Sequence, residues 1–194
     1  PRRFGKSLLL STIEAYLQGK KELFNGLAIE KLEKEWKAYP VLHLDLNARH
    51  YKDTDSLTSI LNEYLERWEA LYGNEKQGRG LEERFAYVIE RAYKTTGQRV
   101  VILIDEYDKP MLQALHDDEL QEQLRNMLKP FYGVLKTMDG YIKLAFLTGV
   151  TKFGKVSVFS DLNNLNDISM DERYVALCGM TEEEIHHYFK DDIH

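Results

Sequence analysis

Apolar residues recur at helical spacing in four parts of the chain, and a glycine follows each part within a few positions. The stretch from Leu57 to Leu71 is the clearest case, because its apolar positions fall along one face of a helix. Asp55 or Ser56 is the expected N-cap of that helix. The same spacing predicts helices over residues 5–18, 81–95 and 119–136.

Three short apolar runs predict strands at Tyr39–Leu46, Arg99–Glu106 and Tyr141–Leu147. The second run has no polar residue between Arg99 and Asp105, which is typical of a strand buried on both faces. Helices and strands alternate along the chain, so the expected fold class is α/β.

The segments between these elements carry weaker signals. A helical turn or two is expected at Ile29–Trp36, and a short edge strand is expected at Leu165–Ile168. Gly73–Gly80 is rich in glycine and polar residues and is the best candidate for a mobile loop. Thr181 and Glu184 match a capping box and predict that a helix begins there.

The start of the first helix, Gly5-Lys6-Ser7, carries candidate chemistry. It matches the second half of the phosphate-binding loop G-x-x-x-x-G-K-[ST], whose first glycine would fall one residue before Pro1. Gly5 lets the backbone approach a phosphate, Lys6 can reach the β- and γ-phosphates, and Ser7 can ligate Mg²⁺. Simple N-capping of the helix is the alternative. The expected nucleotide-binding residues are Arg3, Phe4, Gly5, Lys6, Ser7 and Leu8, and Lys6 is also expected to be catalytic.

Asp105 and Glu106 end the second expected strand, at the edge of the sheet where open α/β folds bind ligands. Asp105 is expected to hold Mg²⁺, and Glu106 is expected to polarise the attacking water as a general base. The alternative is a strand that simply stops at polar residues. Together with the Gly5-Lys6-Ser7 motif, however, the two carboxylates favour a nucleoside triphosphate site with ATP and Mg²⁺ as cofactors.

Other polar residues are candidates for contacting the same ligand. Thr148, at the tip of the third expected strand, is expected to touch the γ-phosphate or the attacking water, with Thr151 as the reserve. An ordinary strand-ending threonine is the alternative. The loop of residues 47–55 follows a strand and lies either near the nucleotide or in solvent. An arginine finger is also expected, and the candidates are Arg49, Arg125 and Arg173.

Composition and charge narrow the function classes. The chain has 194 residues, which suits one domain, and 43% of them are hydrophobic, which is enough for a sizeable core. The net charge of −6 argues against broad binding of nucleic acid, although a local basic patch remains open. Cys178 is the only cysteine, so the reducing cytoplasm is the expected compartment. No apolar stretch approaches the ~18 residues of a membrane span, and no membrane association is expected.

Four motifs occur in order along the chain, at Pro1–Ser7, Ile104–Pro110, Leu147–Phe153 and Ser160–Ile168. Together they closely resemble the predicted AAA-ATPase-like family, which is common in gut anaerobic bacteria. The resemblance covers essentially the whole chain, and the combination is specific although each motif alone is not.

The resemblance implies a P-loop ATPase of the additional-strand type, a three-layer α/β/α fold with a central, mostly parallel sheet. One strand would separate the Asp105–Glu106 strand from the loop strand, and that loop strand would precede Pro1. The domain at residues 1–180 is therefore expected to lack its first strand, and residues 181–194 are expected to begin a following helical segment. Members of the family often carry a C-terminal nuclease-like domain of the PD-(D/E)xK type.

Three functions remain in competition. The leading hypothesis is an ATPase, a hydrolase of acid anhydrides, whose turnover moves Gly73–Gly80 or the C-terminal helices against a C-terminal domain or protein partner. The second is a nucleotide-gated switch or scaffold with little turnover. The third is a DNA-stimulated ATPase of a nuclease-associated system, which Arg2, Arg3, Lys152 and Lys155 keep open despite the acidic balance. The sequence leaves the oligomeric state undecided.

Overall fold

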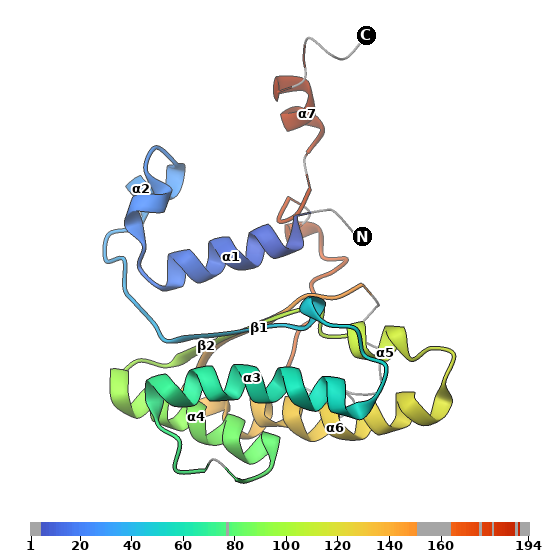
Figure 1. The fold of residues 1–194 in the computed structure, drawn as a ribbon. Coiled ribbons are helices and arrows are strands. Elements are labelled where there is room, and N and C mark those ends of the chain that lie inside the picture. The colour runs from blue at the N-terminus through green and yellow to red at the C-terminus, as the bar shows by residue number, and fades with distance from the viewer. Residues whose placement is uncertain are drawn as a thin grey trace.

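Three parallel strands form the sheet at the centre of the molecule (Figure 1). The computed structural model describes residues 5–76, 78–150, 164–174, 176–179, 181–188 and 190. The strands are β1 (Val41–Asp45), β2 (Val100–Asp105) and β3 (Ile142–Leu147), in the order β1-β2-β3. All three predicted strands are confirmed, with their ends shifted by at most two residues, and the α/β fold class is confirmed with them.

Helices cover both faces of the sheet, and for this reason every residue of β2 is buried. The long helices are α1 (Lys6–Leu17), α3 (Thr54–Tyr72), α4 (Leu81–Thr96) and α6 (Asp118–Thr137). On one face, Leu10 of α1 packs in a cluster with Val101 and Leu103 of β2. The helices α3, α4 and α6 lie on the opposite face (Figure 1). The helical periodicity of the sequence predicted all four.

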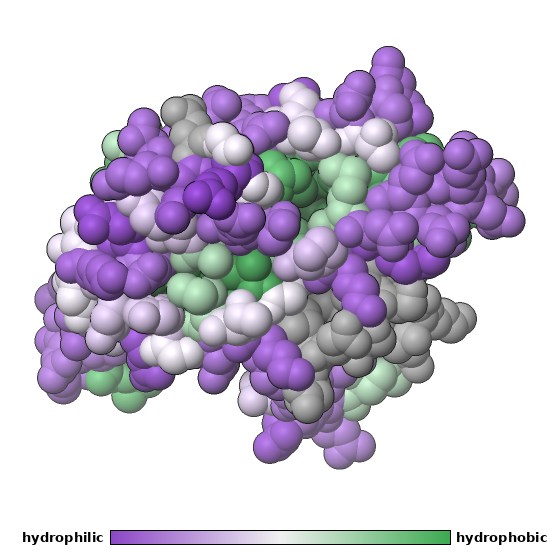
Figure 2. Space-filling model, turned by 90° about the horizontal axis from the view of Figure 1, so that it is seen from below, coloured by the Kyte–Doolittle hydropathy of each residue, from purple (hydrophilic) through white to green (hydrophobic). Residues whose placement is uncertain are grey.

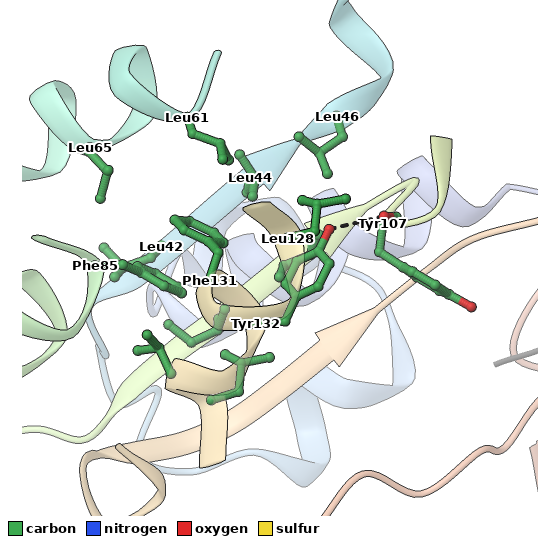
Figure 3. Close-up of a cluster of buried hydrophobic side chains, with 14 of the residues drawn as sticks. Leu42, Leu44, Leu46, Leu61, Leu65, Phe85, Tyr107, Leu128, Phe131 and Tyr132 are labelled. Atoms are coloured by element: carbon green, nitrogen blue, oxygen red, sulfur yellow. Dashed lines mark hydrogen bonds between the residues drawn. The ribbon is translucent and has the colours of Figure 1, made fainter. Parts of the chain in front are cut away.

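The larger core lies between the sheet and α3, α4 and α6. Phe85 of α4 and Phe131 of α6 stack with ring centroids 4.5 Å apart, in the same cluster as Leu42 of β1 (Figure 3). The buried Tyr132 hydroxyl on α6 donates a hydrogen bond of 3.0 Å to the backbone oxygen of Tyr107. This bond fixes the segment that follows β2, where the predicted site lies.

The N-cap predicted from the sequence is wrong for α3, and the capping box predicted for the C-terminal helix is confirmed. Asp53, and neither Asp55 nor Ser56, is the N-cap of α3: its carboxylate accepts the Ser56 backbone N–H at 2.8 Å. The predicted cap was wrong because the helix begins two positions earlier, at Thr54, which leaves Asp55 and Ser56 inside the first turn. The predicted capping box at the C-terminal helix α7 (Glu182–Tyr188) is confirmed, since the backbone N–H of residue 181 donates to the carboxylate of residue 184 at 2.8 Å.

The remaining elements are short. They are η1 (Lys21–Phe24), α2 (Ala28–Leu32), η2 (Leu46–Ala48), α5 (Lys109–Gln113), η3 (Asp139–Tyr141) and η6 (Glu172–Tyr174). The helix expected over Ile29–Trp36 ends at Leu32, where Glu33 turns to an extended conformation. The edge strand expected at Leu165–Ile168 was wrong, because these residues form no ladder with a described strand.

The outer face of α3, α4 and α6 is mainly hydrophilic. Figure 2 views the molecule from this side and shows hydrophobic residues only in small areas between polar ones. Over the part of the chain that the structure describes, no helix is long and apolar enough to span a bilayer.

A buried ion pair joins α3 to α4. The Arg84 guanidinium donates through Nε and one terminal nitrogen to the two carboxylate oxygens of Glu69, each at 2.7 Å. Asn62 accepts a further hydrogen bond of 2.5 Å from the same guanidinium. The side chains of Arg84 and Glu69 are only 7% and 2% exposed, so each depends on the other for its charge partner.

We expect Arg84→Met to lower the free energy of unfolding by about 3 to 5 kcal/mol, because it leaves the Glu69 carboxylate buried without its counter-ion. Chemical denaturation followed by circular dichroism measures the loss. Arg67→Met is the matched control on the exposed face of α3, where removal of the ion pair with Glu63 should lower stability by less than about 1 kcal/mol. Equal losses of stability in the two variants would show that burial does not determine how much the pair of Arg84 and Glu69 contributes to the free energy of unfolding.

Candidate functional site

The carboxylate of Asp105 stands at the centre of the site, at the C-terminal end of β2. The Ser7 hydroxyl on α1 donates to Asp105 Oδ2 at 2.5 Å, and the Thr148 hydroxyl after β3 donates to Asp105 Oδ1 at 2.5 Å. Asp105 is 3% exposed and Thr148 is 8% exposed. Three segments far apart in the sequence therefore meet at one buried carboxylate.

The sheet itself brings Thr148 beside Asp105. The backbone N–H of Thr148 donates to the Ile104 oxygen, and the N–H of Tyr107 donates to the Thr148 oxygen, both at 2.9 Å. These bonds extend the pairing of β3 with β2 by one residue beyond the end of β3. A polar residue at position 148 is thereby held next to the carboxylate that ends the neighbouring strand.

Gly149 allows the close approach that this arrangement requires. A Cβ at position 149 would lie 2.6 Å from the Tyr107 ring and 2.8 Å from Asp108 Oδ1. The other carboxylate oxygen of the buried Asp108 accepts the backbone N–H of Val150 at 2.9 Å. Asp108 therefore holds the turn after β3 with its side chain. It is also the N-cap residue of α5, but its side chain makes no capping hydrogen bond to that helix.

Lys6 and Glu106 form an ion pair next to this centre. Lys6 Nζ lies 3.5 Å from Glu106 Oε1, and the two side chains are 15% and 17% exposed. Glu106 also has a left-handed backbone with φ of 54°, an unusual conformation for a residue with a long side chain. The turn that it makes directly after β2 separates its side chain from that of Asp105, so the two acids have different partners.

The N-terminus of α1 has the features of an anion site. Gly5 is the N-cap with a left-handed φ of 80°, and no side chain among the described residues caps the helix. The first turn also contains no acidic residue. In any α-helix the first backbone N–H groups lack an acceptor within the helix, and the helix dipole favours a negative charge at this end.

A second contact fixes α1 against the sheet. His43 Nδ1 of β1 lies 2.7 Å from Glu14 Oε2 of α1. The hydrogen bond that His43 donates to the Glu14 carboxylate is the main reason why the pKa of His43 is raised above 6.5, although burial opposes the shift. The same bond to His43 is the largest cause of the lowered pKa of Glu14, whose ordinary value is 4.5. The helix that carries Lys6 and Ser7 is thus tied to the neighbouring strand.

A cleft of about 710 Å³ lies beside the ion pair of Lys6 and Glu106, and both residues line it. Gly5 to Leu8 line one part of it, and Glu106, Asn47 and Lys109 line another. The Lys109 ammonium donates to the backbone oxygen and to the side-chain oxygen of Asn47, at 2.7 and 2.5 Å. The sequence signal for Asn47 was its position after a strand, which left the choice between site and solvent open; the structure places it at the cleft.

The site fits a phosphate chain and its magnesium ion. Uncapped amides and Lys6 suit a polyphosphate, and the Ser7 hydroxyl beside the Asp105 carboxylate is a donor set that Mg²⁺ prefers. Among the described residues, no three His, Cys, Asp or Glu side chains gather to hold a metal ion. Most ligands of an ion here would therefore come from phosphate oxygens and water, which is usual for Mg²⁺.

The remaining predicted site residues fall into two groups. Arg3, Phe4, Thr151, Lys152 and Lys155 are outside the described residues. The candidates for an arginine finger make other contacts: Arg49 pairs with Glu63, Arg173 pairs with Asp171, and Arg125 donates to Gln121. None of these three arginines lines the cleft in the part of the chain that the structure describes.

Comparison with known proteins gives the family. The chain belongs to the family described as "Predicted AAA-ATPase", whose model matches residues 1–159, and the resemblance predicted from the motifs is confirmed. The chain is 40% identical over 193 residues to the "Uncharacterized protein in vnfD 5'region" of Azotobacter chroococcum mcd 1. That match covers the whole of this chain but 37% of the relative. No solved structure matches the chain.

We expect Gly149→Ala to lower the free energy of unfolding by about 1 to 3 kcal/mol, because the added methyl group overlaps Tyr107 and Asp108. Thermal unfolding by calorimetry measures the effect. Gly140→Ala is the matched control, since its Cβ would meet nothing within 4 Å. A Gly149→Ala variant as stable as the control would contradict the close packing of this turn.

The contact between His43 and Glu14 predicts a pH-dependent contribution to stability. A raised pKa of His43 stabilises the fold below about pH 6.5, and this contribution is lost as the pH rises through the raised value. A lowered pKa of Glu14 stabilises the fold above about pH 4.5 and is lost as the pH falls through the lowered value. The pair therefore contributes most between these two limits.

We expect His43→Asn, which keeps a hydrogen-bonding group without the charge, to be less stable than the natural protein by up to about 1 kcal/mol near pH 5.5. The difference should shrink as the pH rises above the raised pKa of His43. Denaturant unfolding across a pH series measures it. A difference that stays constant from about pH 5 to about pH 9 would exclude the charged pair as its cause.

Proposed function

We propose that the chain is a magnesium-dependent ATPase domain with the three-layer P-loop fold. Helices on both faces of a parallel sheet and a cleft at the C-terminal ends of its strands support this fold. Membership of the predicted AAA-ATPase family supports the activity. The single observation that carries the proposal is the placement of Ser7 and Lys6 beside Asp105 and Glu106.

The roles of the residues follow from their chemistry. The amides at the start of α1 and the Lys6 ammonium would hold the phosphates of ATP, while Ser7 and Asp105 would hold Mg²⁺. The ion, when bound, neutralises charge on the phosphate oxygens. Thr148 keeps Asp105 oriented through its hydroxyl, and the same hydroxyl is our candidate for sensing the γ-phosphate.

The ion pair between Lys6 and Glu106 gives the site a way to respond to its substrate. A carboxylate paired with an ammonium is a weaker proton acceptor than an unpaired one. A polyphosphate that draws Lys6 toward its own oxygens would release the Glu106 carboxylate to accept a proton from water. Glu106 would thus become the general base only when the cleft is filled.

ATP hydrolysis in this domain would be coupled to the movement of another domain or protein. The match covers 37% of the curated relative's length. The resemblance to the family, and not this coverage, is our reason for proposing a C-terminal domain or another protein as the partner. The segment between α3 and α4, residues 73–80, and the C-terminal helices are the parts that we expect turnover to move. A switch with little turnover and a DNA-stimulated ATPase are the two competing functions.

We expect Glu106→Gln to lower the rate of phosphate release from ATP by about 100-fold or more, because the amide cannot accept the proton of the attacking water. Steady-state phosphate release with Mg²⁺ measures the rate, and titration calorimetry checks that ATP still binds. Glu90→Gln is the matched control, since Glu90 is a partly exposed residue of α4 that pairs with Lys94 and does not line the cleft.

Each outcome distinguishes one of the functions. Equal rates in Glu106→Gln and the control would remove Glu106 from the mechanism. Tight ATP binding with negligible turnover in the natural protein would favour the switch. A rate that rises when DNA is added would favour the nuclease-associated ATPase.

A further inference from the structure

The cleft contains a second cation in addition to Lys6. Lys109 begins α5, and its backbone N–H donates to the Glu106 oxygen at 3.0 Å. Its side chain lines the same cleft as Gly5 to Leu8. Lys109 therefore follows the expected general base by less than one helical turn, at the part of the cleft that Glu106 marks.

A short chain of hydrogen bonds holds the Lys109 ammonium in place. Asp45 at the end of β1 accepts the backbone N–H of Asn47 at 2.7 Å, which fixes the 3₁₀ turn η2. Both oxygens of Asn47 then accept hydrogen bonds from Lys109 Nζ. An ammonium has three N–H donors, so these two bonds leave a third donor for a ligand.

The charge of Lys109 is not neutralised by the described part of the protein. Lys6 is paired with Glu106, and Lys94 on the distant helix α4 is paired with Glu90. By contrast, no carboxylate of the described residues lies within ion-pair distance of Lys109, whose two partners are the neutral oxygens of Asn47. A cation held by neutral groups at the wall of a cleft is prepared to receive an anion.

We infer that Lys109 binds the terminal phosphate of a nucleoside triphosphate and makes the site prefer triphosphates over diphosphates. This inference rests on the proposed function, because it assumes that the start of α1 holds the inner phosphates and that Lys6 reaches the β- and γ-phosphates. Lys109 then fills, from within the same chain, the place for which an arginine was expected from the sequence. The three candidate arginines are engaged elsewhere, at Glu63, Gln121 and Asp171.

The test compares the affinities for two ligands in the natural full-length protein. Titration calorimetry with Mg²⁺ measures the Kd of ADP and the Kd of an ATP analogue whose terminal bridge is an imido group. We expect Lys109→Met to weaken binding of the analogue about tenfold, which is the loss of one charge-assisted hydrogen bond, and to change the Kd of ADP by less than about twofold.

Two further variants refine the result. Lys109→Arg keeps the charge and should retain most of the preference for the triphosphate. Asn47→Ala removes one of the two oxygens that hold Lys109 and leaves the backbone oxygen, so it should lower the preference by a smaller factor than Lys109→Met. Lys94→Met is the matched control and should change neither Kd. Circular dichroism and thermal unfolding check that every variant is folded.

The outcomes separate this inference from the proposed function. If the natural protein binds the analogue but Lys109→Met weakens both ligands equally, or weakens neither, Lys109 does not recognise the terminal phosphate. Equal affinity of the natural protein for the two ligands would also overturn the inference. If the natural protein binds neither nucleotide, the proposed function itself fails.

Discussion

The site depends on one buried carboxylate that accepts two hydroxyl groups. Asp105 ends the central strand and receives Ser7 from one side and Thr148 from the other. A carboxylate can be held in an apolar interior when its lone pairs are satisfied, and both of these bonds are 2.5 Å long. The apolar packing of α1 and β3 on β2 brings the Ser7 and Thr148 hydroxyls to the Asp105 carboxylate, so the hydrophobic core determines the geometry of the site.

The charged groups of the cleft pair with one another in this structure. Lys6 contacts Glu106, and Lys109 contacts Asn47. Both contacts line the cleft, and an ammonium gains more from the charged oxygens of a phosphate chain than from one carboxylate oxygen or from neutral oxygens. A polyphosphate would therefore meet ammonium groups that are already oriented, and it would replace contacts that hold these groups less strongly. In such an arrangement the two lysines would change partners when the ligand binds, and no loop would have to become ordered first.

The parts of the fold that repeat regularly along the sequence were predictable. The unbroken apolar run of β2 predicted a strand buried on both faces, because nothing but burial explains such a run. The four long helices followed from their apolar spacing. Local choices were harder: Asp53 and Asp55 are both good caps, and only the packing of α3 decides between them. The apolar residues at Leu165–Ile168 have strand-like spacing but no neighbour that completes a ladder among the described residues.

The candidate site was predictable where it coincides with a motif. Gly5-Lys6-Ser7, Asp105 and Glu106 meet as the motif requires, and Thr148 joins them because parallel strands end at one edge. Contacts between residues far apart in the chain could not be predicted from the sequence pattern. Lys109 lies inside the motif Ile104–Pro110 and Asn47 follows a strand, but the two are separated by 62 positions and neither signal indicated that their side chains touch. The ion pair of Glu69 with Arg84 likewise looks solvated in the sequence, and only the three-dimensional fold buries it.

The left-handed backbone of Glu106 has a practical consequence for anyone who redesigns this chain. Glycine suits a φ of 54° better than any residue with a Cβ, so the fold would gain about 1 kcal/mol from a glycine there. A procedure that ranks substitutions by melting temperature alone would therefore remove the carboxylate that faces Lys6. Stabilised versions of this domain should be selected with Glu106 kept, since glycine at this position favours stability while the proposed function requires the carboxylate.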